Sequence, residues 1–300
     1  MQPTPITKEL KTKKIENQTF DEERALYNIK DTEVINCTFA GEADGESVLK
    51  EGRNYKVKNC SFSLRYPMWH AQKFSLINSS MDDKTRAPLW YCTDGEISGC
   101  KIDGVKCLRE CKNILVKGSN IVSPEFGWKC SDITIEDSTV DSMYFLFETD
   151  NVEIKNLTMT GKYSFQYMNN LHITDSNLDT KDAFWHSKNV LVENSVVKGE
   201  YLGWFSENLT LKNCRIIGTQ PLCYCKNLKL VNCTMENTDL SFEYSDVDAD
   251  ITGHIDSVKN PKSGTIVADS VGEIIEEDAI MPCSGKVIIR QPEAADGTNG

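Results

Sequence analysis

The sequence lacks the long apolar segments that membrane proteins need. No window approaches the eighteen consecutive apolar residues of a transmembrane helix. The first fourteen residues, MQPTPITKELKTKK, also lack the apolar segment of a secretory signal peptide. We therefore expect a cytoplasmic protein with no membrane partner.

An excess of basic residues is also missing. The chain has 33 Lys and Arg against 45 Asp and Glu, a formal net charge of -12 at pH 7, and it has no block rich in Lys and Arg. Surfaces that bind nucleic acids are strongly basic, so no nucleic-acid partner is expected. The same charge disfavours a polyanionic substrate unless a cation bridges it to the protein.

Paired cysteine motifs are absent, although the chain has twelve cysteines. There is no CxxC pair, and Cys107 and Cys111, which are spaced like zinc ligands, lack a second pair. Neither a metal site nor a cofactor is predicted. Most of the cysteines instead recur at two fixed positions of a repeat, which favours small core residues in a reducing compartment.

That repeat is the main feature of the sequence. One phrase reads NLTLKNC at 208–214, NLKLVNC at 227–233 and NVLVENS at 189–195. If its last residue is taken as an anchor, the copies are spaced by 23, 19 and 21 residues and then by 19 residues seven times. The anchors are Cys37, Cys60, Ser79, Cys100, Ser119, Ser138, Leu157, Ser176, Ser195, Cys214 and Cys233.

Each copy alternates apolar and polar residues, as Leu209, Leu211 and Ile216 illustrate. A period of two predicts a strand, and nineteen residues without a helical rhythm are too few for a β-α-β unit. One coil cannot fold alone, because ordering its backbone costs about 1–2 kcal/mol per residue. The sequence therefore predicts an all-β, single-stranded parallel β-helix of about twelve stacked coils with a C-terminal cap.

The unbroken repeat predicts one elongated domain. We expect a polar lead-in at 1–12, the β-helix at 13–252, C-terminal cap strands at 253–291 and a disordered tail at 292–300. The two longer coils have turn-forming residues at 40–47 and 81–88, which are the predicted insertions. Six residues before each anchor the residue is nearly always Asn or Asp, which predicts an Asn ladder at a bend.

All five tryptophans share one position, ten residues before an anchor, which we call the tryptophan column. The next position, nine before the anchor, is the outer column. Two adjacent positions that both break the alternation indicate a bend at which both side chains point outward. The candidate ligand-binding residues in these columns are Trp69, His70, Trp90, Tyr91, Arg109, Trp128, Lys129, Phe147, Tyr167, Trp185, His186 and Trp204.

The tryptophan column allows two interpretations. The rings could stack inside the solenoid, as repeated aromatic residues often do. Alternatively they form an exposed strip, because Lys50, Arg109 and Gln166 share the column and would be costly to bury unpaired. An exposed line of Trp and Tyr beside polar groups suits stacking on the sugar rings of a chain-like ligand.

Glu110 and Glu148 in the outer column are the candidate catalytic residues. They lie two coils apart, about 9.6 Å at the backbone by rung spacing, and inverting glycosidases place their carboxyl groups about 6.5–9.5 Å apart. Lys129 between them fits an ion-pair ladder equally well. In a turn column, Asp82 and Asp103 could share a cation, although turn chemistry also accounts for them.

Several phrases resemble a bacterial family known only as a domain of unknown function within the pectate-lyase-like group of right-handed parallel β-helices. They include CSFSLRYPMWH at 60–70, LDTKDAFWH at 178–186 and GTQPLCYCKNLKL at 218–230, and the resemblance covers about 15–273. It implies right-handed coils and brings no established activity. The polygalacturonase motifs of the wider superfamily do not occur here as a set.

Three functions are therefore considered. The first is glycan binding through the aromatic strip. The second is a carbohydrate-active enzyme, a polysaccharide hydrolase or lyase, with Glu110 and Glu148 as acid and base on the same face. The third is a structural or protein-interaction solenoid in which the strip is core or an oligomer interface. The expected partners are a glycan or oligosaccharide and, in the third case, further copies of the chain.

Overall fold

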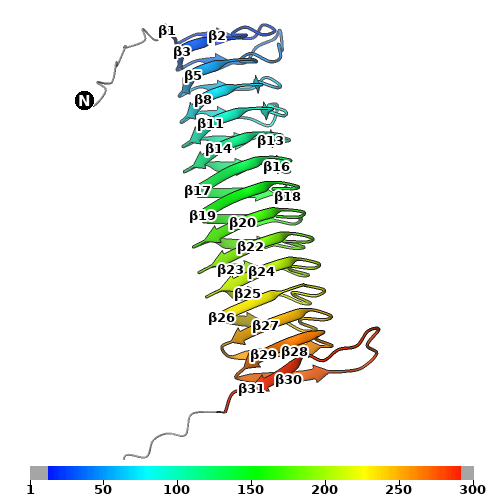
Figure 1. The fold of residues 1–300 in the computed structure, drawn as a ribbon. Helices are drawn as coiled ribbons and strands as arrows, with labels where there is room; N and C mark the ends of the chain where they lie inside the picture. The colour runs from blue at the N-terminus through cyan, green and yellow to red at the C-terminus, as the bar shows by residue number, and fades with distance from the viewer. Residues whose placement is uncertain (1–12, 292–300) are drawn as a thin grey trace, which may run out of the picture.

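The chain folds as a right-handed parallel β-helix, as predicted (Figure 1). The computed structural model describes residues 13–291, so the predicted lead-in and disordered tail lie outside the described residues. Every regular element from 13 to 291 is a β-strand. No helix in this part of the chain has the length and apolar character to cross a membrane.

One strand of each coil joins a continuous parallel ladder along the column. Its side chains alternate, so that in β5 Tyr55 and Val57 are buried between exposed neighbours. The ladder has about 15 turns rather than twelve, because thirteen of its strands lie before residue 252 and two more follow it. The ladder strands are β1 (Lys13–Glu16), β3 (Lys30–Ile35), β5 (Arg53–Lys58), β8 (Gln72–Ile77), β11 (Thr93–Ser98), β14 (Lys112–Lys117), β17 (Ser131–Ser142), β19 (Asp150–Gly161), β20 (Asn169–Thr174), β22 (Lys188–Glu193), β24 (Glu207–Lys212), β26 (Leu228–Glu236), β27 (Asp246–Ile251), β29 (Ser263–Ala268) and β31 (Lys286–Ile289).

Two further faces complete each coil. The second face consists of the long ends of β17, β19 and β26 together with β2 (Thr19–Phe20), β4 (Thr38–Phe39), β6 (Ser61–Phe62), β9 (Ser80–Met81), β12 (Lys101–Asp103), β15 (Asn120–Val122), β21 (Asn177–Thr180), β23 (Val196–Lys198) and β25 (Arg215–Ile217). The third face has strands only in the middle coils. They are β7 (Met68–Trp69), β10 (Leu89–Trp90), β13 (Cys107–Arg109), β16 (Glu125–Trp128) and β18 (Tyr144–Phe145).

The two long coils have their extra residues at the predicted places. Phe39 is in register with Phe20, nineteen residues earlier, but the amide of Leu26 bonds the carbonyl of Val48, so the four extra residues lie between Phe39 and Val48. In the other long coil, Met81 and Leu89 bracket the two extra residues. Both insertions are turns, which leave the ladder intact.

Equivalent residues of successive coils stack in the core. Phe39 and Phe62 lie 4.5 Å apart with nearly parallel rings. All twelve cysteines are free, and eleven are buried. At the anchor, the Cys60 amide donates to Ser79 Oγ at 3.0 Å, and Ser79 Oγ donates to the carbonyl of Ile77. Cys and Ser therefore serve the same hydrogen-bonding purpose there, and burial raises the pKa of the Cys60 thiol to about 11.

Two corners of each coil carry amide ladders. The predicted ladder, six residues before the anchors, is confirmed, since Asn170 Nδ2 donates to Asn151 Oδ1 at 3.0 Å. A second ladder stands directly before the anchors, where Asn213 Nδ2 donates to Asn194 Oδ1 at 3.0 Å. Residues in both ladders have positive φ, a conformation that Asn tolerates well.

Residues 253–291 continue the β-helix. β29 pairs with β27 and β31 with β29 in parallel register, while β28 (His254–Lys259) and β30 (Ser270–Ile275) form a small sheet of their own. Arg290 fastens the end, because its guanidinium bonds Asp269 Oδ1 and the carbonyl of Ile251, each at 2.6 Å, and also pairs with Asp250. The last rung is thus tied to the two rungs before it.

Candidate functional site

The two columns singled out from the sequence lie at the corner between the third face and the ladder. β7, β10 and β16 end at Trp69, Trp90 and Trp128, and the next residue in each case has a positive φ. This left-handed residue turns the chain, so that neighbouring side chains emerge on the same side. The predicted bend is therefore present.

The outer column is largely exposed. Tyr167 is 50% exposed and Phe205 43%. The rings of Tyr167, His186, Phe205 and Tyr224 form a stack, which we call the ring ladder. Its successive centroids are 5.0, 4.9 and 4.8 Å apart, and neighbouring planes lie within 14° of each other. The faces of the inner rings are covered by their neighbours, so the ladder presents a row of ring edges to solvent.

The tryptophans occupy an intermediate position, since all five are half-buried. The indole N–H of Trp69 donates to the carbonyl of Ala87 at 3.0 Å, and those of Trp185 and Trp204 donate in the same way to residues one coil later, at 2.6 and 2.8 Å. The column is therefore neither core nor a free surface. It is a rigid support beneath the outer column, with four of its five indole N–H groups directed to the backbone.

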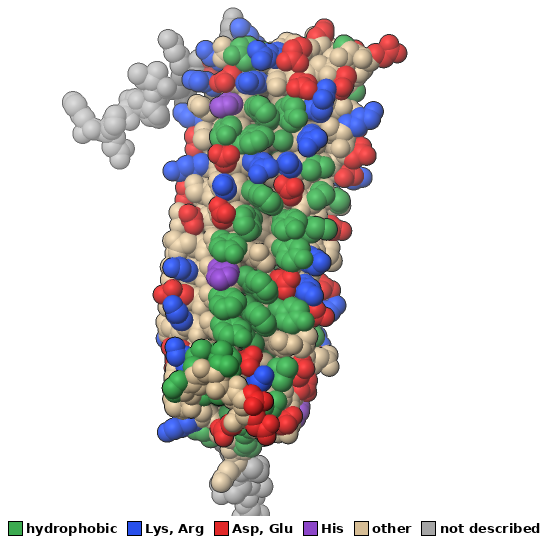
Figure 2. Space-filling model, turned by 90° about the vertical axis from the view of Figure 1, so that its right-hand side faces the viewer, with side chains coloured by type: hydrophobic (Ala, Val, Ile, Leu, Met, Phe, Trp, Pro, Cys, Tyr) green, Lys and Arg blue, Asp and Glu red, His purple; other side chains and the backbone are tan. Residues whose placement is uncertain are grey.

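Figure 2 shows the combined surface. Hydrophobic side chains form a band along the length of this face, with charged side chains interrupting it in the upper half. We call the two columns together the aromatic strip. Phe147 belongs to it and packs against Trp128 at 5.2 Å and, edge-on, against Tyr167 at 5.4 Å. The candidate residues named from the sequence in these columns thus share one surface.

The polar members of the tryptophan column are paired. The Arg109 guanidinium lies between the rings of Trp90 and Trp128, 5.2 and 5.0 Å from their centroids, and forms an ion pair with Glu125 at 3.6 Å. Gln166, which is 9% exposed, donates to a backbone carbonyl at 2.9 Å. Burial is tolerated here because each group has a partner.

Three charged residues interrupt the outer column, and we call Glu110, Lys129 and Glu148 the acidic break. All three are exposed. Lys129 Nζ lies 3.7 Å from Glu148 Oε2, and Glu110 Oε1 accepts the indole N–H of Trp90 at 3.2 Å. The role of Glu110 and Glu148 as acid and base stays a prediction from the sequence.

Sequence reasoning missed a third aromatic position, thirteen residues before the anchors. Tyr66 packs on Trp69 at 4.8 Å, and Tyr201 meets Trp204 edge-on at 5.4 Å. Tyr144 packs edge-on against Trp128 in the same way. These tyrosines widen the strip on the side of the third face. The nineteen-residue spacing of Tyr144 and Tyr163 was the available signal.

One residue of the outer column is misplaced by simple counting. Nine residues before Thr252 is Glu243, but the amide of Tyr224 bonds the carbonyl of Glu243, which puts Tyr244 in the outer column. The ring of Tyr244 lies 5.6 Å from that of Tyr224 and extends the aromatic row. The prediction failed because this coil has one extra residue between Glu236 and Asp239, and the nineteen-residue register returns only at Val247.

The possible cation position lies on the second face. Asp82 and Asp103 line a shallow groove with Lys101, and Asp82 Oδ1 accepts the amide of Lys84 at 3.0 Å. Within residues 13–291, no group of three or more His, Cys, Asp or Glu side chains is arranged to hold a metal. Cation sharing by Asp82 and Asp103 stays a prediction.

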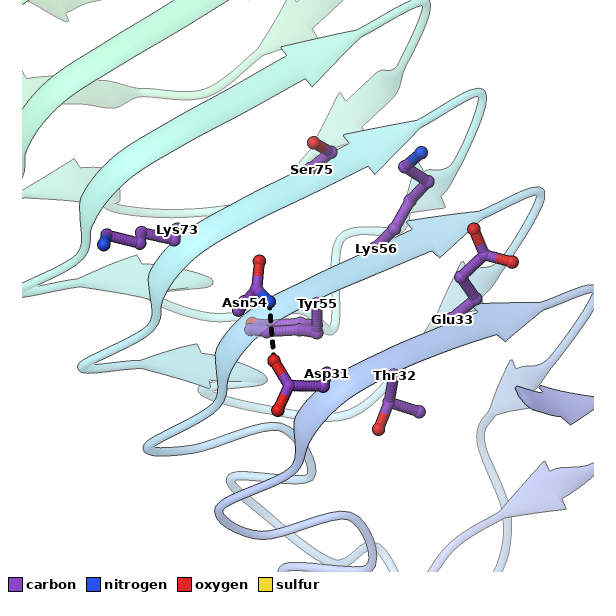
Figure 3. A pocket seen from close by; sticks show the side chains of 8 residues that line it. All are labelled: Asp31, Thr32, Glu33, Asn54, Tyr55, Lys56, Lys73 and Ser75. Carbon is purple, nitrogen blue, oxygen red and sulfur yellow. Dashed lines mark hydrogen bonds between the residues drawn. The ribbon is translucent and has the colours of Figure 1, made fainter. Parts of the chain in front are cut away.

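Another groove lies on the ladder face of the first coils (Figure 3). Asn54 Nδ2 donates to Asp31 Oδ1 at 2.6 Å, and Glu33, Lys56 and Lys73 project around it. Its one aromatic residue is buried in the core. The groove therefore offers mixed charges without an exposed ring, unlike the aromatic strip.

Comparison with known proteins identifies a family but no activity. A family model described as a protein of unknown function (DUF3737) matches residues 13–289. No curated protein matches the chain.

Solved structures share the fold at low similarity. PfbA, a surface adhesin of Streptococcus pneumoniae, is 10% identical with a TM-score of 0.43, over 72% of this chain and 71% of that one. The A-module of the mannuronan C-5 epimerase AlgE6 of Azotobacter vinelandii is 12% identical with a TM-score of 0.37, over 93% and 89%. The tailspike protein 3 of bacteriophage CBA120 is 9% identical with a TM-score of 0.32, over 92% and 51%. Similarity at this level concerns the fold alone.

Proposed function

We propose that this chain, which belongs to the DUF3737 family of proteins of unknown function, binds an oligosaccharide lengthwise along its aromatic strip. The observation that carries the proposal is the choice of residue at one left-handed corner. The two amide-ladder corners hold Asn, Asp or Gly almost throughout, whereas the third holds Tyr, His, Phe, Glu and Lys, also at positive φ.

Folding alone does not favour that choice. A left-handed conformation costs an ordinary residue roughly 1–2 kcal/mol, and the outer column also exposes aromatic surface to water. Tyr91, Tyr167 and Phe205 combine both penalties. Strained residues that recur on an exposed surface point to a ligand-binding role.

The shape of the strip supports a linear, chain-like ligand. Sugar rings combine apolar C–H faces with hydroxyl groups, so they suit a surface of aromatic side chains flanked by polar ones. The tryptophan column is held by backbone hydrogen bonds, which makes the surface rigid before a ligand arrives. The strip repeats at about the 4.8 Å spacing of parallel strands, so successive sugars meet equivalent positions.

A glycan array followed by titration calorimetry tests the proposal. The informative variant carries Tyr91→Asn and Tyr167→Asn, because Asn suits the left-handed backbone and removes both rings. We expect affinity to fall at least tenfold, since burying one aromatic side chain contributes about 1.5–3 kcal/mol and 1.4 kcal/mol is a factor of ten.

The matched control is Val231→Asn, which removes an apolar side chain that is 44% exposed on the ladder face. It should bind like the parent. Equal affinity of the double variant and the parent would place binding elsewhere, and an array without any bound saccharide would contradict the proposal altogether.

A further inference from the structure

The acidic break divides the aromatic strip into two parts. Tyr91 packs on His70 at 5.1 Å on one side of it, and Tyr167 stacks on His186 at 5.0 Å on the other. Three successive outer-column positions between Tyr91 and Tyr167 hold charges instead of rings. A ligand lying along the strip must cross these charges.

The charges of the break do not cancel. Lys129 pairs with Glu148 at 3.7 Å, whereas Glu110 accepts a hydrogen bond from the neutral indole N–H of Trp90. Arg109, which lies beside Glu110 in the chain, is directed instead to Glu125. The break therefore has a formal charge of one negative unit, from two carboxylates and one ammonium, in a chain whose net charge is -12.

This arrangement distinguishes between classes of sugar. A carboxylate-bearing sugar would meet like charge, which costs affinity and slows association. An ammonium group would form a charge-assisted hydrogen bond to Glu110. Electrostatics therefore favours a cationic sugar over an anionic one.

We propose that the acidic break recognises an amino sugar in its ammonium form, so that the preferred ligand is a glycan that contains free amino sugars and not a uronate polymer. This inference rests on the proposed glycan binding. Glu110 contacts the ammonium, and Glu148 with Lys129 contacts the neighbouring sugar through hydrogen bonds. Tyr91 and Tyr167 bracket this segment of the chain.

Three hexasaccharides of equal length test it by calorimetry at a mildly acidic pH that keeps the amines protonated. They are hexaglucosamine, its fully N-acetylated form and hexagalacturonate. We expect hexaglucosamine to bind at least tenfold more tightly than the acetylated form, and hexagalacturonate to bind most weakly. In the variant Glu110→Gln with Glu148→Gln, the tenfold preference for hexaglucosamine over its acetylated form disappears.

A second double variant separates specific recognition from general attraction between an acidic protein and a cation. Glu136→Gln with Glu236→Gln removes two carboxylates that are paired with Lys117 and Arg215, away from the strip. It should keep the preference for hexaglucosamine. If the preference for hexaglucosamine fell equally in both double variants, general attraction to the acidic protein would explain it, and the inference would be overturned.

The remaining outcomes are also decisive. Equal binding of the acetylated and free-amine sugars, unaffected by the Glu110 and Glu148 changes, overturns the role of the break and leaves the proposed function intact. Absence of binding by all three sugars, on the array as well as in calorimetry, removes both proposals together.

Discussion

At least four residues in nearly every coil adopt the left-handed conformation, and those at the three corners differ in what stabilises them. At the two amide-ladder corners, side-chain hydrogen bonds such as Asn170 to Asn151 and Asn232 to Asn213 offset the cost of positive φ. At the outer column the compensation is ring stacking, which contributes about 0.5–1.5 kcal/mol per pair. The fold therefore tolerates aromatic residues at that corner without requiring them.

The first residue-scale prediction follows for Tyr167. Tyr167→Asn loses the stack on His186 but relieves a left-handed strain of about 1–2 kcal/mol. We expect the free energy of unfolding, measured by urea denaturation, to change by less than about 1 kcal/mol, because the two terms oppose each other. The comparison variant is Asn170→Ala, which keeps the strain and removes a ladder hydrogen bond. It should be the less stable of the two, and a larger loss in Tyr167→Asn would show the ring to be structural.

At the residue scale, some left-handed corners could be predicted from the sequence and others could not. The Asn column six residues before the anchors was predictable, because Asn in a periodic turn indicates a left-handed residue. The orientation of Trp128 was not, because alternation describes strands and its phase is lost at a bend. The repeat also fails at Tyr244, because one extra residue earlier in that coil moves an aromatic side chain into the position expected for Glu243.

At the level of elements, each rung is held by the rungs on either side, and the last rung has only one such neighbour. Arg290 supplies the missing connection, because it joins the end of β31 to Asp269, Asp250 and the carbonyl of Ile251. The hydrogen bond from Arg290, followed by the amide of Gly253, lowers the pKa of Asp269. This contact was not visible in the sequence, because residues 250 to 290 are distant and follow no repeat.

The second prediction concerns this C-terminal contact. Arg290→Ala should raise hydrogen exchange at the amides of β31 while β19 in the centre stays protected, as mass spectrometry of peptides can resolve. Arg215→Ala is the control, because Arg215 forms a similar ion pair with Glu236 and lies in β25, a strand that has neighbours on both sides. Exchange in β25 should not change. Unchanged protection of β31 in Arg290→Ala would contradict the role of the arginine.

The same contact predicts a dependence on pH. A carboxyl group with a lowered folded-state pKa adds stability above its unfolded value, about 3.9 for Asp, and this contribution is lost as the pH falls through the lower, folded value. Exchange at β31, corrected for the intrinsic effect of pH, should therefore rise in acid in the parent before it rises at β19. In Arg290→Ala, this early acid response should be absent.

At the scale of the whole molecule, the nineteen-residue period of the sequence determines most of the fold. Each coil contacts only its neighbours, so the nineteen-residue spacing was sufficient to predict strands, register and the two insertions. The candidate binding surface could be derived only in part in the same way. It combines columns that follow the repeat with departures from it, such as the acidic break, and the repeat itself gives no reason for departures.

The final prediction concerns the removal of one whole coil, which should leave the others folded because each coil contacts only its neighbours. Deleting residues 177–195 joins Ser176 to Val196, the residue that pairs with Asn177 in the parent, so every later column keeps its register. The deletion also brings Tyr167 next to Phe205, and the acidic break is untouched. We expect a folded β-helix with a cooperative thermal transition and an unchanged preference for hexaglucosamine, measured by circular dichroism and calorimetry.

The control deletion is one residue shorter and removes 177–194. It leaves Ser195 after Ser176 and shifts one coil by a single residue, which turns buried side chains such as Val197 outward. This variant should lose its cooperative transition, although it retains more of the chain. If both deletion variants unfolded alike, the stability of the β-helix would depend on contacts beyond neighbouring coils, and each coil could not be treated as an independent unit.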